Sequence, residues 1–387
     1  HHFSSAVRGG MTMYSDQPIG GQLRLARMAW GQSLDDVGAS AHSTRQYIHQ
    51  LETGAKIPTA DMLAVLAEVM GVQENYFHKV NSAPVTAEQC HFRKQQTTPM
   101  SITSQVLARG TLLDCFVSKL DKQLRLPKVN FPDQAIKSDE EIEQVAEACR
   151  RHWNLGVIAP ITNMMRVVEN AGAVVTYFHG ISERVDALSM DRRRPIIVRS
   201  SAKESLCRLR FDLAHETGHL VMHRGLHTGD QVTENQANRF ASAFLLPRAG
   251  FLKEFPRGPR LNWPVMFQMK RRWKVAVRAI VRRALNLGLI TPSQYRSANI
   301  HLVKTGQAKS ERYDDELPME DPELLNTALE ALKQAKPHAI RSIVDDLGWD
   351  DRLYKLIIGK ALPPTSPADG TVNLLHARLK RARDHNT

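Results

Sequence analysis

The chain has 387 residues, and its balance of 42% hydrophobic and 24% charged residues excludes a wholly disordered chain. Lysine and arginine number 52 against 40 aspartates and glutamates, and the net charge of +12 favours a polyanionic partner, with nucleic acid first. The sequence shows no signal peptide, no apolar run near the roughly 18 residues of a membrane helix, and no CxxC pair among its four cysteines. We therefore expect a cytoplasmic protein with no membrane contact, no disulfide framework and no cysteine zinc knuckle.

Changes of pattern along the chain predict an α+β, mostly helical protein with two or three domains. The order is a tag-like or disordered segment at 1–19, several short helices at 20–80, a polar and partly helical connector at 81–138, a region of helices and short strands at 139–305, and a helical extension with a basic tail at 306–387. The opening His1-His2-Phe3 looks like a tag, with Met11 or Met13 a plausible native start.

The helices of the first region are marked by apolar residues at helical spacing and by caps. Thr44 stands as the N-cap of a helix that Gly54 ends, and Thr59 caps the next one. The apolar positions are Leu23, Ala26 and Trp30, then Leu34 and Val37, and later Leu63, Leu66, Ala67 and Met70.

The helix after Thr44 has the side chains of a DNA-recognition helix near its start. Arginine can form two hydrogen bonds to guanine, and glutamine two to adenine, in the major groove. The candidate DNA-binding residues are Thr44, Arg45, Gln46, His49 and Gln50.

Residues 20–80 resemble the Xre/Cro-type helix-turn-helix family, through 36–38, 44–48 and 51–54, followed by Pro58. The resemblance implies a five-helix domain that binds double-stranded DNA as a homodimer, at a near-palindromic operator in its own promoter. The turn departs from the family, which usually has glycine where His42 stands, and a non-glycine residue is mildly costly where φ is positive. The alternative is a helical adaptor of the same fold that binds protein instead of DNA.

The sequence Phe211–Leu220, FDLAHETGHL, contains the spacing of a metal site. His215 and His219 are four residues apart, so both imidazoles leave one face of a helix and can reach the same ion. Glu216 can take a proton from metal-bound water without being a ligand itself. The opposite stripe predicts burial of the helix against a core through Leu206, Leu209, Leu213 and Leu220.

The third ligand is expected to be Glu234. His223 lies eight residues from His215, about 12 Å of helical rise, which is too far for a shared ion. A capping box of Thr233 and Gln236 would place Glu234 in the first turn of a helix ended by Pro247. Supporting roles around the ligands are expected for Asp212, His223 and Asn238.

This part of the chain resembles the ImmA/IrrE metallopeptidase family over roughly residues 90–300, on Arg208 with Phe211, on 215–219 and on 234–247. The resemblance implies a gluzincin-like zinc peptidase fold, with Zn²⁺ as the cofactor. It also implies regulated removal of a repressor, or a role in a stress response. An Xre-type domain ahead of this peptidase is a recurrent arrangement in bacteria and mobile elements.

Three further features complete the prediction. Runs at 173–178 and 195–198 predict strands, and the acidic stretch 311–316 predicts a linker. A basic segment could be either a nucleic-acid surface or one amphipathic helix with a solvated charged face. Its residues are Lys270, Arg271, Arg272, Lys274, Arg278, Arg282 and Arg283.

Three functions stay open at this point. The first is a DNA-binding transcriptional regulator with an active zinc endopeptidase, which cleaves a regulatory protein such as a repressor or antitoxin. The second is a transcriptional repressor whose peptidase-like half only senses a signal. The third is an antitoxin or immunity component whose main partner is another protein, such as a toxin.

Overall fold

A computed structural model of the chain describes residues 18–79, 84–86, 89–94, 99–181, 185–199, 205–226 and 228–363. The chain divides into two compact units, the first made of His1–Asn81, Cys115–Leu124 and Ala328–Thr387, the second of Ser82–Asp114 and Arg125–Thr327. The tag-like segment before residue 18 and the basic tail lie outside the described residues. The domain boundaries expected from the sequence are linear, whereas this partition groups segments that are distant along the chain.

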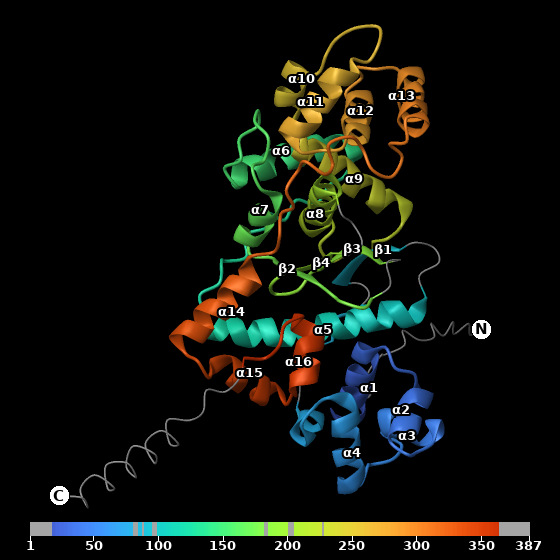
Figure 1. Ribbon diagram of the computed structural model, residues 1–387, viewed down its shortest axis with the longest axis vertical. Coiled ribbons are helices and arrows are strands. Elements are labelled where there is room, and N and C mark those ends of the chain that lie inside the picture. Colours follow the sequence, from blue (N-terminus) through green and yellow to red (C-terminus); the bar gives the residue numbers. More distant parts are fainter. Residues whose placement is uncertain are drawn as a thin grey trace, which may run out of the picture. The chain divides into compact units, whose positions relative to one another are not determined.

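The first unit begins with five helical segments, coloured blue in Figure 1. They are α1 (Pro18–Trp30), α2 (Leu34–Ser40), α3 (Arg45–Glu52), α4 (Ala60–Met70) and the 3-10 helix η1 (Glu74–His78). The predicted caps are confirmed, because the Thr44 hydroxyl accepts from the Tyr47 amide and the Thr59 hydroxyl from the Met62 amide. A bidentate ion pair joins α1 to the end of α3, with Arg27 Nε 2.5 Å from Glu52 Oε1.

Helices near the C-terminus also belong to this first unit. They are α14 (Leu324–Ala335), whose last eight residues belong to it, α15 (Ala339–Leu347) and α16 (Asp351–Ile358). The Gln73 amide donates to the Gly348 carbonyl at 2.8 Å, and the Asp350 amide donates to the Gly71 carbonyl at 3.0 Å. The extension at 306–387 is therefore not an appendage, because its described helices share backbone hydrogen bonds with the helix-turn-helix region.

The second unit contains a four-stranded sheet in the order β1-β3-β4-β2. The strands are β1 (Cys90–Lys94), β2 (Val174–Tyr177), β3 (Val185–Met190) and β4 (Ile196–Arg199). β3 is antiparallel to β1 and β4, and β2 is parallel to β4. The predicted strands at 173–178 and 195–198 are confirmed as β2 and β4. β1 and β3 were not predicted because their mixed polar sequences become strands only through pairing, β1 with β3 and β3 with both β1 and β4.

In the second unit the helix α8 (Leu206–Met222) packs against β3 and β4, and the helix α9 (Gln231–Leu245) packs against α8 (Figure 1). The others are α6 (Ile142–His152), which follows a 3-10 turn at Asp139–Glu141, α7 (Met164–Asn170), α10 (Arg248–Glu254), α11 (Trp263–Trp273), α12 (Val277–Asn286) and α13 (Pro292–Lys304). The four leucines predicted on one stripe of α8 are buried, but so are most of its polar residues. α8 is thus a central helix and not an amphipathic one.

The polar and partly helical connector expected at 81–138 includes one long helix. It contains α5 (Met100–Gln123), a helix of 24 residues that is continuously buried from Gln105 to Val117. Two charged residues inside it are paired: Arg192 Nη2 lies 2.8 Å from the Asp114 carboxylate, and Arg109 donates to the His179 carbonyl at 2.5 Å. The sequence appeared polar because these partners come from distant parts of the chain.

The acidic stretch and the basic segment bind each other. Lys270, which is fully buried, lies 2.7 Å from Asp314 and 3.2 Å from Glu311. Arg283 is also buried and pairs with Glu143. The basic segment is therefore not one amphipathic helix but α11 and α12, separated at Lys274, where φ is 53°. The expected acidic linker is part of the second unit.

Among the described residues, no helix combines the length and the apolar character needed to cross a lipid bilayer.

The turn between α2 and α3 generates a stability prediction. His42 has a φ of 49°, in the left-handed region, as the sequence indicated. We expect His42→Gly to stabilise this region by about 0.5–1 kcal/mol, because a side chain costs more in this conformation than glycine loses in unfolded-state entropy. Hydrogen exchange of the α2 and α3 amides should slow accordingly.

Ser43→Gly is the matched control, since Ser43 is outside the left-handed region. It should not slow exchange. If both substitutions slowed hydrogen exchange equally, the proposed backbone strain at His42 would be wrong.

Candidate metal centre and nucleic-acid interface

The second unit brings three potential ligands together from two helices. His215 Nε2 lies 3.0 Å from His219 Nε2, and the carboxylate of Glu234 lies 3.3 Å from each imidazole. In the part of the chain that the structure describes, this is the group of histidine, cysteine and acidic residues found close enough to hold one metal ion.

These separations fit a tetrahedral zinc ion. Bonds of 2.0–2.1 Å at tetrahedral angles require neighbouring ligand atoms to be roughly 3.3 Å apart. The three distances among His215, His219 and Glu234 are 3.0, 3.3 and 3.3 Å. The donor set of two imidazoles and one carboxylate leaves a fourth position for water, as in catalytic zinc sites.

Close packing of α9 on α8 positions Glu234. A Cβ on Gly218 of α8 would lie 2.9 Å from the Phe240 ring of α9, so only glycine allows this approach. Ala237 and Ala241 of α9 are fully buried. Small side chains at these positions let the two helices come near enough for a glutamate to reach both histidines.

The cap of α9 differs from the prediction. The carboxylate of Asp230, and not Thr233, caps the helix by accepting from the amides of Val232 and Thr233. The capping box with Gln236 is therefore wrong, because the helix begins two residues before Thr233. Glu234 nevertheless lies in the first turn.

The outer nitrogens of the two histidines have protein partners. His215 Nδ1 lies 3.0 Å from Asn238 Oδ1, and His219 Nδ1 lies 2.9 Å from His223 Nδ1. His223 Nε2 in turn lies 2.9 Å from Gln236 Oε1. Asn238 and His223 can therefore fix the rings without occupying a ligand position.

Glu216 is buried beside the ligand cluster. Its carboxylate accepts a hydrogen bond of 2.6 Å from the Ser189 hydroxyl on β3. Burial raises the pKa of Glu216 to about 7, His215 and Ser189 oppose that shift, and Glu234 and Asp212 add to it by repulsion. A carboxyl group with a pKa near neutrality can both accept and return a proton.

The ionisation of the cluster follows from its surroundings. Burial lowers the pKa of His219 to about 4. Burial alone would raise the pKa of Glu234, but hydrogen bonds from His215 and His219 hold it well below its usual range. Neutral imidazoles and an ionised carboxylate are the protonation states that bind a metal.

Two neighbours of the site were not assigned a role from the sequence. They are Ser189 on β3 and His91 on β1, which are paired across the sheet. The His91 ring stacks on His219 with centroids 5.0 Å apart and 6° between the planes, and burial lowers the pKa of His91 to about 3. No local signal predicts these roles, because both residues reach the site only through strand pairing.

The first unit presents the candidate DNA-binding residues on α3. Arg45, Gln46 and His49 are exposed, and Gln50 is half-buried. Arg45 forms a long ion pair of 3.6 Å with exposed Asp35, so its guanidinium can turn to another partner. Thr44 is exposed and caps the helix.

Family models match one segment in each unit. Residues 18–76 match a helix-turn-helix domain, and residues 168–285 match an IrrE N-terminal-like domain, which is a metallopeptidase family. No curated protein matches the chain. The resemblance of both segments is thereby confirmed, and peptidases of this second family are generally zinc-dependent. The roles of individual residues stay predictions.

The ligand assignment can be tested by metal analysis. Purified protein dialysed against a weak chelator should hold about one zinc per chain. Glu234→Ala should lower zinc affinity at least 100-fold, since it removes a ligand, whereas His223→Ala should keep most of the metal. The assignment is wrong if His223→Ala empties the site while Glu234→Ala does not.

Proposed function

We propose that this chain, in which a helix-turn-helix domain is joined to an IrrE-like metallopeptidase domain, is a DNA-binding transcriptional regulator with a zinc-dependent endopeptidase. The observation that carries the proposal is the tetrahedral spacing of His215, His219 and Glu234 beside the buried carboxylate of Glu216. A purely structural site would need four protein ligands, whereas this one leaves a position open for water.

The residues of the chain have distinct tasks in the proposed reaction. Bound zinc supplies a Lewis acid and activates water at neutral pH. Glu216 takes the proton of the attacking water and returns it to the nitrogen of the departing amine. Ser189 holds the Glu216 carboxylate in place with its 2.6 Å hydrogen bond. Asn238 orients His215 through the outer nitrogen of the ring.

The substrate that we propose is a regulatory protein, such as a repressor or an antitoxin. The protein would act in the cytoplasm of a bacterium, in a stress response or in the response of a mobile element. These points rest on the resemblance to the ImmA/IrrE family and on the presence of a helix-turn-helix domain in the same chain.

The DNA that we propose is a near-palindromic operator in the promoter of the protein's own gene, bound by a homodimer. The support is the exposed start of α3, where Arg45 and Gln46 follow directly after the cap. Side chains in this position of a helix-turn-helix contact base edges in the major groove.

Removal of the base should separate chemistry from metal binding. Glu216→Gln keeps the size of the side chain and its contact with Ser189, so zinc should stay while hydrolysis of a protein substrate falls at least 100-fold. The assay measures cleavage of the products of neighbouring genes, together with the zinc content.

Glu330→Gln, an exposed position on α14, is the control and should cleave at the normal rate. Unchanged cleavage by Glu216→Gln would point to another mechanism. If Glu330→Gln protein with full zinc cleaves none of these products, the domain is a sensor or a protein-binding module, which is the alternative function.

DNA recognition can be tested at Arg45. Arg45→Ala should cost about 1–3 kcal/mol of binding free energy on the promoter fragment and little on scrambled DNA, because a base contact carries sequence preference. Both DNAs are compared at one salt concentration, since phosphate contacts alone give affinity at low salt.

Lys355→Ala removes one exposed positive charge from α16 of the same unit and is the matched control. It should weaken binding to the two DNAs equally or leave both unchanged. Equal weakening by Arg45→Ala would assign that residue to the phosphate backbone, and no binding to either DNA would give the domain a protein partner.

A further inference from the structure

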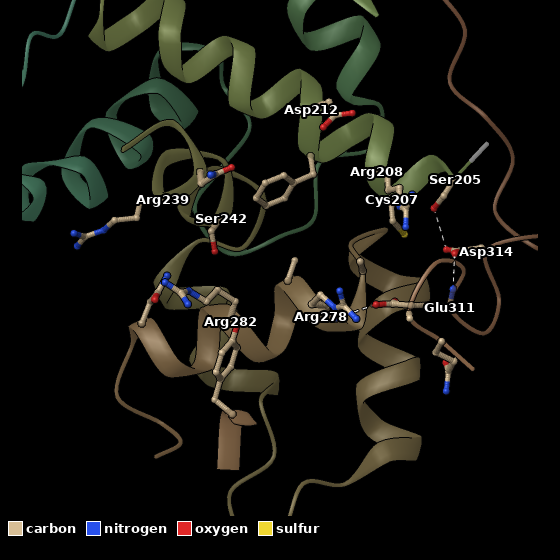
Figure 2. Close-up of a pocket in the computed structure, with 18 of the residues that line it drawn as sticks. Ser205, Cys207, Arg208, Asp212, Arg239, Ser242, Arg278, Arg282, Glu311 and Asp314 are labelled. Carbon is tan, nitrogen blue, oxygen red and sulfur yellow. Dashed lines mark hydrogen bonds between the residues drawn. The ribbon is translucent and has the colours of Figure 1, made fainter. Parts of the chain in front are cut away.

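A pocket separate from the ligand cluster lies within the second unit. It has a volume of about 910 Å³ and is bounded by α8 and α9 on one side and by α12, α13 and residues 307–314 on the other. Figure 2 shows the pocket, with residues of α9 facing those of α12 across it. Its size is that of a small-molecule site and far exceeds what one inorganic ion requires.

The charge that this pocket presents is positive. Its cationic side chains are Arg208, Arg239, Arg278, Arg282 and Lys309, and its acidic ones are Asp139, Asp212, Glu311 and Asp314. Three of the acidic groups already have cationic partners, because Lys270 binds Glu311 and Asp314, and Arg239 binds Asp139.

Two arginines stand on the same face of α12. Arg278 and Arg282 are four residues apart, and both are exposed. The Arg282 guanidinium lies over the Tyr295 ring, 5.5 Å from its centroid, which limits where it can point. A planar guanidinium held in this way can form two parallel hydrogen bonds to an oxyanion.

A hydroxyl without a partner among the described residues faces Arg282. Ser242 of α9 is 4% exposed, and its Oγ has no hydrogen-bond partner among the described residues. In Figure 2 this oxygen points from α9 toward Arg282. A buried hydroxyl without a partner destabilises the protein, and a ligand oxygen in the pocket would satisfy it.

We propose that this pocket binds a phosphorylated small molecule. A phosphate group offers oxygens that the Arg282 guanidinium and the Ser242 hydroxyl can bind, and Arg278 adds positive charge one helical turn away. The remaining space is lined in part by the rings of Phe211 and Tyr295, which suit an organic group of nucleotide size.

The pocket also adjoins the metal centre. Asn238 lines it and is the residue that contacts Nδ1 of His215, on the opposite side of the ring from the ligand cluster. A ligand that orders Asn238 would therefore favour the ring orientation that binds zinc. This link rests on the proposed function, whereas the binding site itself does not.

The binding site is tested by calorimetric titration of the full chain at constant ionic strength, with AMP, pyrophosphate and citrate as separate probes. AMP and pyrophosphate should bind at one site per chain, and Arg282→Gln should weaken them at least 10-fold. Arg271→Gln removes the same charge from an exposed arginine outside the pocket and should change the affinity less than 2-fold.

Ser242→Ala distinguishes a ligand contact from a structural role. It should weaken AMP and pyrophosphate 3–10-fold and leave the thermal midpoint of the ligand-free protein unchanged or higher, because the hydroxyl has no partner to lose. A lower midpoint would overturn the assignment of Ser242.

Three results of the titration would overturn the proposal. The proposal is overturned if none of the probes binds, if citrate alone binds, or if Arg282→Gln and Arg271→Gln weaken binding equally. The titration is repeated with Glu216→Gln, so that its result does not depend on peptide hydrolysis.

The proposed coupling between the pocket and the metal centre is tested by measuring zinc affinity with and without saturating AMP. The affinity should rise at least 3-fold with AMP, and Asn238→Ala should abolish the difference. Equal zinc affinities in the unsubstituted protein would overturn the link but not the binding site.

Discussion

The close approach of α8 and α9 is the constraint on which the candidate metal centre depends. Both histidines lie on α8, and the glutamate that completes the cluster lies on α9. With a larger residue than glycine at 218, the Phe240 ring would hold the helices apart. Zinc sites tolerate errors of only about 0.2 Å in ligand distance, so helix packing and metal chemistry cannot be separated here.

The second unit also buries charged side chains in ion pairs. Arg210 is fully buried and lies 2.5 Å from Glu320, in the same way as Lys270 holds the segment around Glu311. Buried ion pairs contribute little net stability but are costly to break, because one charge is then left alone. The ion pairs of Lys270 with Glu311 and Asp314 fix the segment 307–314, which forms one wall of the pocket. The Ser242 hydroxyl, which has no partner among the described residues, belongs to the wall formed by α9.

The division of the chain into two units limits how the proposed DNA binding and peptide hydrolysis can be separated experimentally. The first unit combines both ends of the chain with the segment Cys115–Leu124, and the second unit consists of the two stretches between them, Ser82–Asp114 and Arg125–Thr327. A truncation at 305 would remove α14, α15 and α16, and with them the hydrogen bonds that Gln73 and Gly71 make to 348–350. Point substitutions are therefore the sounder way to separate DNA binding from chemistry.

The sequence by itself determined whatever depends on residues a few positions apart. The caps at Thr44 and Thr59, the strained turn at His42, and the His215–His219 spacing are local features, and local geometry is dictated by neighbours along the chain. The two domain resemblances rest on such local motifs and are confirmed for the same reason.

Tertiary structure alone decided what depends on distant partners. Ser189 and His91 reach the site through strand pairing, and α5 is buried because its polar residues find partners far along the chain. Asp230 took the cap that the sequence assigned to Thr233, since both types of side chain cap well and only the path of the backbone decides between them. Two cations of the basic segment are buried because distant carboxylates offset the cost of burial: Glu311 and Asp314 pair with Lys270, and Glu143 pairs with Arg283. Charge counting along the chain cannot reveal such partners.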